Sequence, residues 1–195
     1  MSRNAEVERV TKETNIIMKL DLDGEGKSTI DTGIGFFNHM LEGFAKHGFF
    51  FLDVKINGDL HVDGHHTVED AGIVLGNAIK QAVGDKKGIQ RYGYFILPMD
   101  DALALCAVDL CSRPYLQFDC NFPQSMVGDF DTSLVKEFFY AVCYSAGMNI
   151  HLKLLSGENS HHMIEAIFKA FAKALDSAVM TEPRIKDVLS TKGSL

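Results

Sequence analysis

The sequence lacks any apolar run that approaches the roughly 18 residues of a membrane-spanning helix. It also lacks a basic cluster, since 19 Lys and Arg residues stand against 26 Asp and Glu residues, giving a formal net charge of -7. Neither this charge nor any alternation of aromatic and basic residues indicates a nucleic-acid groove. The first six residues are too polar for a secretory signal. We therefore expect a cytoplasmic protein with no membrane and no nucleic-acid partner.

Cysteine is scarce, and the few that occur are not arranged as a motif. The four cysteines are Cys106, Cys111, Cys120 and Cys143, and no two of them form a Cys-x-x-Cys pair. Three lie within apolar, strand-like stretches. We interpret them as reduced core residues of a cytosolic protein rather than as disulfides or thiolate ligands.

Two matching motifs dominate the sequence. They are His65-His66-Thr67-Val68-Glu69 and His161-His162-Met163-Ile164-Glu165, 96 residues apart, and each runs into a long apolar-periodic stretch. On a helix, residues i and i+4 share a face, so the first His and the Glu of each motif point the same way. Adjacent histidines diverge by about 100° and can serve different metal ions. Imidazole suits several transition metals and carboxylate suits harder ions such as Mn²⁺, so each motif is interpreted as half of a metal site.

The two halves of the chain repeat one order of elements. At an offset of 96 residues, six of the 19 positions in 65–83 are identical to their counterparts. An offset of 88 sets Glu13 against Asp101, and an offset of 98 pairs His39 with Glu137; loop insertions produce such drifting offsets. We predict an α+β fold built from two copies of a strand–strand–helix–strand–helix unit, with helices on one face of each mixed sheet.

The predicted organisation is one compact duplicated domain with a first half over 1–87, a second half over 88–185 and a C-terminal substrate-binding tail over 186–195. With 195 residues, 46% of them hydrophobic, the chain can bury a substantial core. Periodicity and turn signals predict strands over 6–22, 27–32, 49–56, 92–98, 103–110, 114–120 and 149–155. They predict helices over 36–47, 67–83, 132–146 and 161–181, the last with Ser160 as its N-cap. The first two strands are expected to form a hairpin.

Pooling the matched positions gives eight candidate metal ligands, enough for two ions with open coordination positions. They are His39, His65, His66, Glu69, Glu137, His161, His162 and Glu165. The residues alone leave open whether one chain completes a site, because pseudo-symmetric halves can place their sites on opposite edges, where partner subunits complete them. The same ligands also fit a two-metal hydrolase or a non-catalytic module in which His/Glu clusters hold subunits together. His47, His61 and His151 have no matching partner in the repeat, and we expect them to be structural or surface residues.

Further motifs resemble the imidazoleglycerol-phosphate dehydratase family, in family order and over nearly the whole chain. They are Thr32-Gly33-Ile34-Gly35-Phe36-Phe37-Asn38-His39-Met40-Leu41, Asp63-Gly64-His65-His66-Thr67-Val68-Glu69-Asp70, Gly88-Ile89-Gln90-Arg91-Tyr92-Gly93, Pro98-Met99-Asp100-Asp101, Arg113-Pro114-Tyr115, Gly157-Glu158-Asn159-Ser160-His161-His162 and Ser190-Thr191-Lys192-Gly193. This chain departs from the family pattern at Asn38, where Asp is frequent, at Glu137, where His is common, and at Cys111-Ser112, where Ser-Gly is frequent.

The resemblance implies a hydro-lyase of histidine biosynthesis that converts imidazole-glycerol phosphate to imidazole-acetol phosphate. It also implies two Mn²⁺ ions per active site and a shell of 24 subunits with the sites between subunits. The proton to be removed is not acidic, because no carbonyl neighbours its carbon, so a base alone faces a large pKa gap. Two metal ions on the ring nitrogens would give an imidazolate, which expels hydroxide to form a diazafulvene-like intermediate.

The resemblance also suggests residue roles. Glu13 is the candidate acid/base, and Asp101, its repeat partner, is a weaker one. His65, Glu69 and Glu165 are expected to take part in catalysis through the metals, and His39, His65, His66 and Glu69 to surround the substrate. Arg91, Arg113, Ser190 and Lys192 match family positions that bind the phosphate, a role to which the planar fork of Arg is suited. Asp63 and Asn159 are candidates for orienting metal-bound imidazoles.

Overall fold

The first half of the chain forms a four-stranded sheet covered by two helices. The computed structural model describes residues 3–195. The elements of this half are β1 (Asn4–Val10), β2 (Thr14–Asp21), β3 (Ser28–Asp31), α1 (Gly35–Gly48), β4 (Phe51–Gly58) and α2 (His65–Val83). The sheet order is β1-β2-β4-β3; β1 and β4 run antiparallel to β2, and β3 runs parallel to β4.

The second half repeats this topology. Its elements are β5 (Tyr92–Met99), β6 (Ala102–Asp109), β7 (Tyr115–Asp119), β8 (Met126–Val127), β9 (Phe130–Asp131), α3 (Leu134–Ala146), β10 (Asn149–Ser156) and α4 (Ser160–Val179). The sheet order β5-β6-β10-β7 is the counterpart of the first, strand for strand, while β8 and β9 form a small separate hairpin. The predicted duplicated α+β fold is therefore confirmed.

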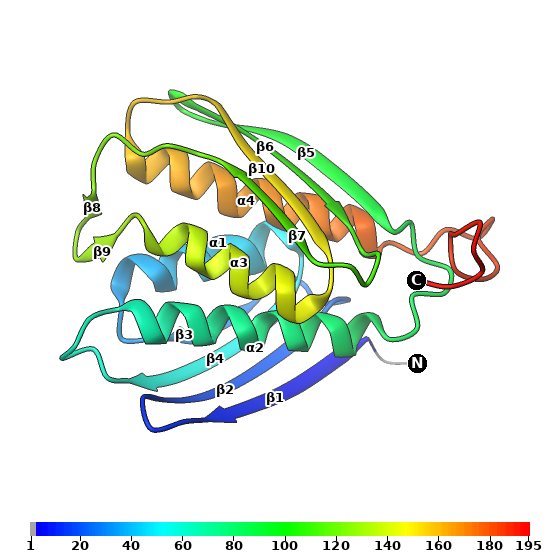
Figure 1. Cartoon of the computed structure of the whole chain (residues 1–195), viewed down its shortest axis with the longest axis horizontal. Coiled ribbons are helices and arrows are strands. Elements are labelled where there is room, and N and C mark those ends of the chain that lie inside the picture. The colour runs from blue at the N-terminus through cyan, green and yellow to red at the C-terminus, as the bar shows by residue number, and fades with distance from the viewer. Residues whose placement is uncertain (1–2) are drawn as a thin grey trace.

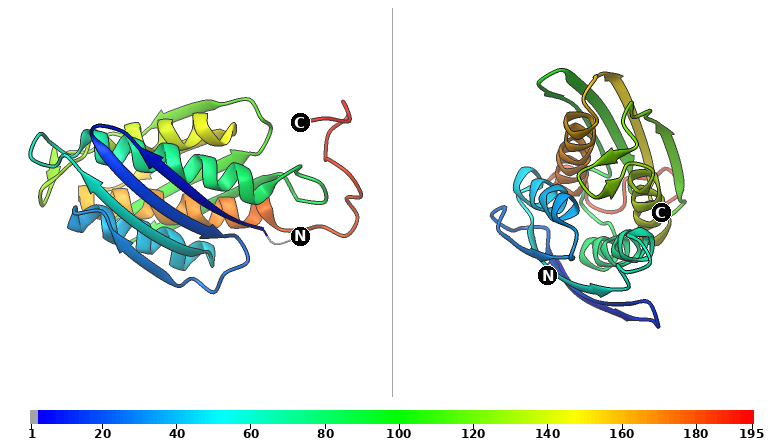
Figure 2. Two further views of the ribbon diagram at one scale, coloured as in Figure 1. Left: turned by 90° about the horizontal axis from the view of Figure 1, so that it is seen from below. Right: turned by 90° about the vertical axis from the view of Figure 1, so that its left-hand side faces the viewer.

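The two sheets form the outer layers and the four helices lie between them (Figure 1; Figure 2 shows the layering from two further sides). Strand β2 alternates strictly, so that Ile16, Met18 and Leu20 enter the core while their neighbours face outward. Between the layers, Phe44 of α1 stacks on Phe171 of α4 with ring centroids 5.6 Å apart. One continuous core thus includes the inner faces of both sheets and the aromatic contacts between the helices.

Helices α2 and α3 approach each other closely because α2 carries glycine at the contact. A Cβ on Gly72 would lie 2.7 Å from the carbonyl oxygen of Phe138, and one on Gly76 would lie 2.6 Å from that of Val142. Both contacts run in the same order along the two helices, so α2 and α3 are parallel. All four helices begin at the same end of the molecule, on the left of Figure 1. The arrangement gathers four helix N-termini, including those of both His-His-x-x-Glu motifs, at that end.

Several predicted elements were wrong in detail. The stretch 6–22 is two strands, because the Thr11 hydroxyl accepts hydrogen bonds from the backbone N–H of Glu13 and Thr14 and turns the chain. The predicted hairpin with 27–32 does not form, since β3 pairs with β4 instead. Each repeat thus has three strands of its four-stranded sheet before its first helix, and the second repeat adds the β8–β9 hairpin, which was not predicted. The N-cap of α4 is Asn159 rather than Ser160, and its side chain accepts from the His161 N–H.

The outer faces of the two sheets differ, although their topology is the same. The first sheet presents mainly polar residues there, including an ion pair between Lys19 and Glu6 at 3.6 Å, although Ile17 is also exposed. The second sheet presents apolar side chains. Tyr94 and Ile96 of β5 are 77% and 51% exposed, and they lie opposite Ala107 and Leu105 of β6. An apolar patch of this kind on a sheet is typical of an interaction surface.

Two further observations bear on the sequence predictions. All four cysteines are free and buried, in agreement with the predicted reduced core. Within residues 3–195, no helix is both long and apolar enough to cross a membrane.

Candidate functional site

The first cluster of candidate ligands lies between α1 and α4. Ligand atoms of His39, His161 and Glu165 all lie within 4.8 Å of one another. The Glu165 Oε2 atom is 3.6 Å from His39 Nε2 and 3.4 Å from His161 Nε2. Phe36 packs edge-on against the His161 ring, with centroids 5.0 Å apart. Two imidazoles and a carboxylate at this spacing suit a first-row transition metal.

Glu165 is the most buried of the three residues in this cluster, and it has a cationic neighbour. Lys169, one turn further along α4, donates to Glu165 Oε1 at 2.6 Å and also approaches the sulfur of Met99 at 3.6 Å. Burial opposes ionisation of Glu165, but the hydrogen bond and charge of Lys169, with smaller contributions from the two histidines, lower its pKa on balance. The carboxylate is therefore charged and held in place before any cation binds.

The second cluster lies at the start of α2 and is looser. His65 Nε2 is 4.0 Å from Glu69 Oε2, and both side chains are close to half exposed. Glu137 lies in the first turn of α3, the helix that packs against α2. Among residues 3–195, however, the His39–His161–Glu165 set is the one in which three ligands come within 4.8 Å of one another. Position 73, the counterpart of Lys169 in α2, is Ile, so the two half-sites are not equivalent.

The second histidine of each motif is oriented by an aspartate. His66 Nδ1 is 2.9 Å from Asp59 Oδ2, and His162 Nδ1 is 2.6 Å from Asp101 Oδ1. These hydrogen bonds raise the pKa of both imidazoles above the ordinary value. When neutral, each ring keeps its proton on Nδ1 and leaves the Nε2 lone pair free for a ligand.

These aspartates were not the predicted orienting groups. Asp63 and Asn159 accept from the backbone N–H of His65 and His161 and so fix helix starts rather than imidazole rings. Asp101 also accepts from the backbone N–H groups of Glu158 and Asn159, and these bonds hold its pKa far below the ordinary range. A group so committed is a poor acid/base.

Asp59 was missed because the turn that it occupies carries no motif of its own. The loop from β4 to α2 folds back and brings its carboxylate to the ring of His66. The other candidate acid/base, Glu13, lies in the β1–β2 turn, half exposed, with Oε1 3.9 Å from His66 Nε2. It therefore stands beside an imidazole that is open for a ligand.

A pocket of about 680 Å³ adjoins the second cluster. The β3–α1 loop, the β4–α2 loop and the β8–β9 hairpin form its walls. Residues lining it include Phe36, Asp63, His65, Asp129 and Asp131. The pocket makes room for a small molecule beside His65.

The predicted phosphate-binding residues lie together in a basic pocket at the opposite end of the molecule. Arg91, Arg113, Ser190 and Lys192 all line a cavity of about 790 Å³, to which Arg184 and Lys186 add further positive charge. Arg91 is already engaged, since it binds both oxygens of Asp109, at 2.7 and 3.1 Å, and donates to the carbonyl of Leu189 at 2.7 Å. Arg91 therefore holds the tail in place, and Arg113 is the freer cation.

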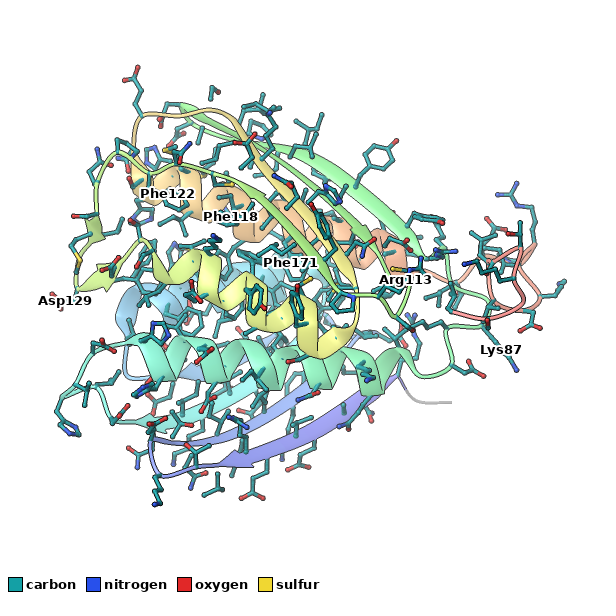
Figure 3. The ribbon with its side chains drawn as sticks, in the orientation of Figure 1. Lys87, Arg113, Phe118, Phe122, Asp129 and Phe171 are labelled. Carbon is teal, nitrogen blue, oxygen red and sulfur yellow. The ribbon has the colours of Figure 1, made fainter. Side chains whose placement is uncertain are left out.

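The metal-ligand clusters and the basic pocket are a whole helix apart. His161 lies in the first turn of α4, whereas the backbone N–H of Arg91 donates to the carbonyl of Ala178 at the end of α4. A helix of 20 residues is about 30 Å long. Figure 3 shows Asp129 at one end of the molecule and Arg113 at the other. Within residues 3–195, a single chain thus brings three of the eight predicted ligands into one close cluster and gathers the predicted phosphate residues in one pocket, but it does not bring the two groups to each other.

Comparisons with known proteins agree with the motifs. The family model described as imidazoleglycerol-phosphate dehydratase matches residues 32–175. This chain belongs to the imidazoleglycerol-phosphate dehydratase family. It is 60% identical over 195 residues, and over the full length of both chains, to the imidazoleglycerol-phosphate dehydratase of Lachnoclostridium phytofermentans. It is 57% identical, also over both full lengths, to that of Acetivibrio thermocellus.

Solved structures of the family share the fold. The chain is similar to the imidazoleglycerol-phosphate dehydratase of Staphylococcus aureus, with a TM-score of 0.84 and 41% identity over 92% of this chain and 99% of that one. For the Pyrococcus furiosus enzyme, solved in complex with (S)-C348, the TM-score is 0.84 and the identity 38%, over 97% and 100% of the two chains. The family places this chain among the dehydratases of histidine biosynthesis, hydro-lyases that act on a phosphorylated imidazole compound.

Proposed function

We propose that this chain eliminates water from D-erythro-imidazole-glycerol phosphate to give imidazole-acetol phosphate, in a reaction that depends on two Mn²⁺ ions per active site. The observation that carries the metal part of this proposal is the His39–His161–Glu165 cluster. Its donor set of imidazole nitrogen and ionised carboxylate fits Mn²⁺ and its neighbours in the first transition row. Family membership supports the reaction itself.

In this proposal His39, His161 and Glu165 hold one ion, and His65 and Glu69 hold the other, with Glu137 beside them on α3. Within residues 3–195, the Nε2 atoms of His66 and His162 make no hydrogen bond, although Asp100 Oδ2 lies 3.6 Å from that of His162. These two histidines would bind ions held mainly by neighbouring chains. When bound to the ring nitrogens, the ions would supply Lewis acidity that makes the ring N–H easier to remove. Asp59 and Asp101 fix the rings of His66 and His162, so the histidines need not reorganise to bind.

Glu13 is proposed to move the proton at the side-chain carbon of the substrate. Its carboxylate lies 3.9 Å from His66 Nε2 and is exposed enough to meet a ligand there. This role is supported by the position of Glu13 beside the open Nε2 atom of His66. Asp101 is less suited to it, because its oxygens already accept hydrogen bonds from backbone N–H groups and from His162. Asp101 is accordingly assigned a positioning role.

The substrate phosphate is proposed to bind in the basic pocket of a different chain. Arg113, Ser190 and Lys192 would donate to it, while Arg91 anchors the tail that carries the last two. A small molecule cannot span α4, so the metal ions and the phosphate site must come from different subunits. We propose an assembly of 24 cytoplasmic subunits with the sites between them, and the apolar outer face of the second sheet supports self-association.

The test is turnover of imidazole-glycerol phosphate by metal-stripped protein before and after addition of Mn²⁺, with the ketone followed optically. We expect no product without metal and restored turnover with it. Folded, metal-loaded protein that forms no ketone with any divalent ion would overturn the proposal. If the inactive protein formed its assembly only when metal was present, the role of the His/Glu clusters would be to hold subunits together, without catalysis.

A further inference from the structure

Lys86 is a buried cation, and its position is not one that would stabilise the fold. It lies in the turn between α2 and β5, and its residue is 8% exposed. Its Nζ donates to the hydroxyl of Ser112 at 2.7 Å, the one side-chain acceptor found for it among residues 3–195. The nearby carboxylates Asp85 and Asp109 pair with Lys87 and Arg91 instead. Burying an ammonium opposite a neutral hydroxyl costs free energy, so this placement needs another justification.

The partner of Lys86 belongs to the turn that carries Arg113. Ser112 lies between β6 and β7 with a φ of 63°, a left-handed conformation that is strained for a side chain other than glycine. From one side, Gly147 packs against this turn, and a Cβ added there would lie 3.4 Å from the Ser112 Cα atom, in van der Waals contact. From another, the Asn149 side chain donates to the Arg113 carbonyl. The bond from Lys86 fixes the turn from a third side.

The ammonium of Lys86 is electrostatically coupled to Arg91, a residue that lines the basic pocket. Burial lowers the pKa of its ammonium; Lys80 and Arg91 add smaller effects in the same direction, and Cys111 and Asp109 oppose them. A nearby anion, such as a bound phosphate, would stabilise the charged form of this lysine. The turns that carry Lys86 and Arg113 lie at the same end of the molecule, where Figure 3 labels Arg113 and the neighbouring Lys87.

We propose that Lys86 is a positioning residue for phosphate binding: through Ser112 it sets the turn that presents Arg113 to the basic pocket. The inference rests on the proposed phosphate site. The ligand class is a phosphate monoester or inorganic phosphate. Lys86 needs no contact with the phosphate itself, because it acts through Ser112.

The experiment measures binding of inorganic phosphate to the full-length assembled protein by calorimetry. Lys86→Met keeps an unbranched side chain that is one atom shorter, and it removes the charge and the hydrogen-bond donor. Ser112→Ala keeps the Cβ, and so the backbone strain, and removes only the acceptor. Each should weaken phosphate binding about tenfold, the scale of one charge-assisted hydrogen bond. The double variant should be no weaker than either single variant, because both remove the same bond.

Two controls separate positioning from other effects. Lys87→Met removes an exposed charge from the same turn and should leave phosphate binding unchanged. Lys86→Met should not lower the melting temperature, since an apolar side chain replaces a buried cation without a carboxylate partner; a merely structural lysine would give the opposite sign.

The outcomes are distinguishable. If Arg113→Ala loses phosphate and Lys86→Met does not, the inference about Lys86 is overturned while the phosphate site stands. If Arg113→Ala also binds normally, the proposed phosphate site itself fails. Additive effects in the double variant, or an equal loss in Lys87→Met, would show that Lys86 does not act through Ser112.

Discussion

Two inactive variants of this chain should restore each other's activity when they share one assembly. His161→Ala removes a metal ligand at the start of α4, and Arg113→Ala removes a cation from the basic pocket at the opposite end. Because α4 is about 30 Å long, an active site that uses both ends must combine two chains. In a mixed assembly, some sites then draw an intact metal end from one variant and an intact phosphate end from the other.

The expected magnitude follows from random mixing. With equal amounts of the two chains, each site draws its two ends independently, so about a quarter of the sites are intact and about a quarter of the wild-type activity returns. The assay is co-expression with two different affinity tags, sequential purification of assemblies that contain both chains, and turnover per chain.

The matched control pairs His161→Ala with Glu165→Gln, which damage the same cluster, so every site has a defective metal end and no activity should return. Verified mixed assemblies of His161→Ala with Arg113→Ala that stay as inactive as their components would refute the reasoning. That result would mean that one chain supplies both ends of a site.

Three further outcomes are expected. Glu165→Gln and Glu69→Gln should each release metal more readily to a chelator; normal metal content with full activity would remove that residue from the ligand set. Asp101→Asn should lower the pKa of His162 towards its ordinary value of about 6.5 and weaken metal binding about 10- to 100-fold, as ring NMR signals and metal titration can measure. In metal-free protein the stabilisation from this pair is present below the unfolded pKa and is lost as pH rises through the raised pKa of His162. The stability gap between wild type and Asp101→Asn should therefore shrink with rising pH, and a constant gap would contradict the assignment. Deleting 189–195 should impair turnover without changing the circular dichroism spectrum, and full turnover would exclude the tail from the site.

Local periodicity predicted most of the secondary structure and the duplication. The His-His-x-x-Glu motifs were expected at helix starts, and α2 and α4 begin at His65 and Ser160. The β1–β2 turn was missed because it depends on the hydroxyl of Thr11 rather than on Gly or Pro. Nor does sequence spacing reveal that β3 crosses to the far edge of its sheet, since that pairing is non-local.

The candidate site was harder to predict because its parts meet through tertiary contacts. The eight proposed ligands could be pooled from the repeat, but the repeat does not show that His39 joins His161 and Glu165 across the two halves of the chain. Asp59 orients His66 from a loop with no motif of its own. The distance between the ligand clusters and the basic pocket depends on the direction of whole helices, which no local pattern encodes.

The four parallel helices also fix the electrostatics of the end at which they begin. Each N-terminus carries about half a positive elementary charge from its aligned peptide dipoles, so four of them together disfavour bare cations there. Carboxylates near these N-termini offset this field: Glu137 lies in the first turn of α3, and Glu69 lies four residues after the start of α2. A glutamate at position 137 is thus favourable for α3 in the absence of metal, and it adds a negative charge that an imidazole would not. These carboxylates therefore reduce the electrostatic repulsion that a divalent cation would meet at this end of the molecule.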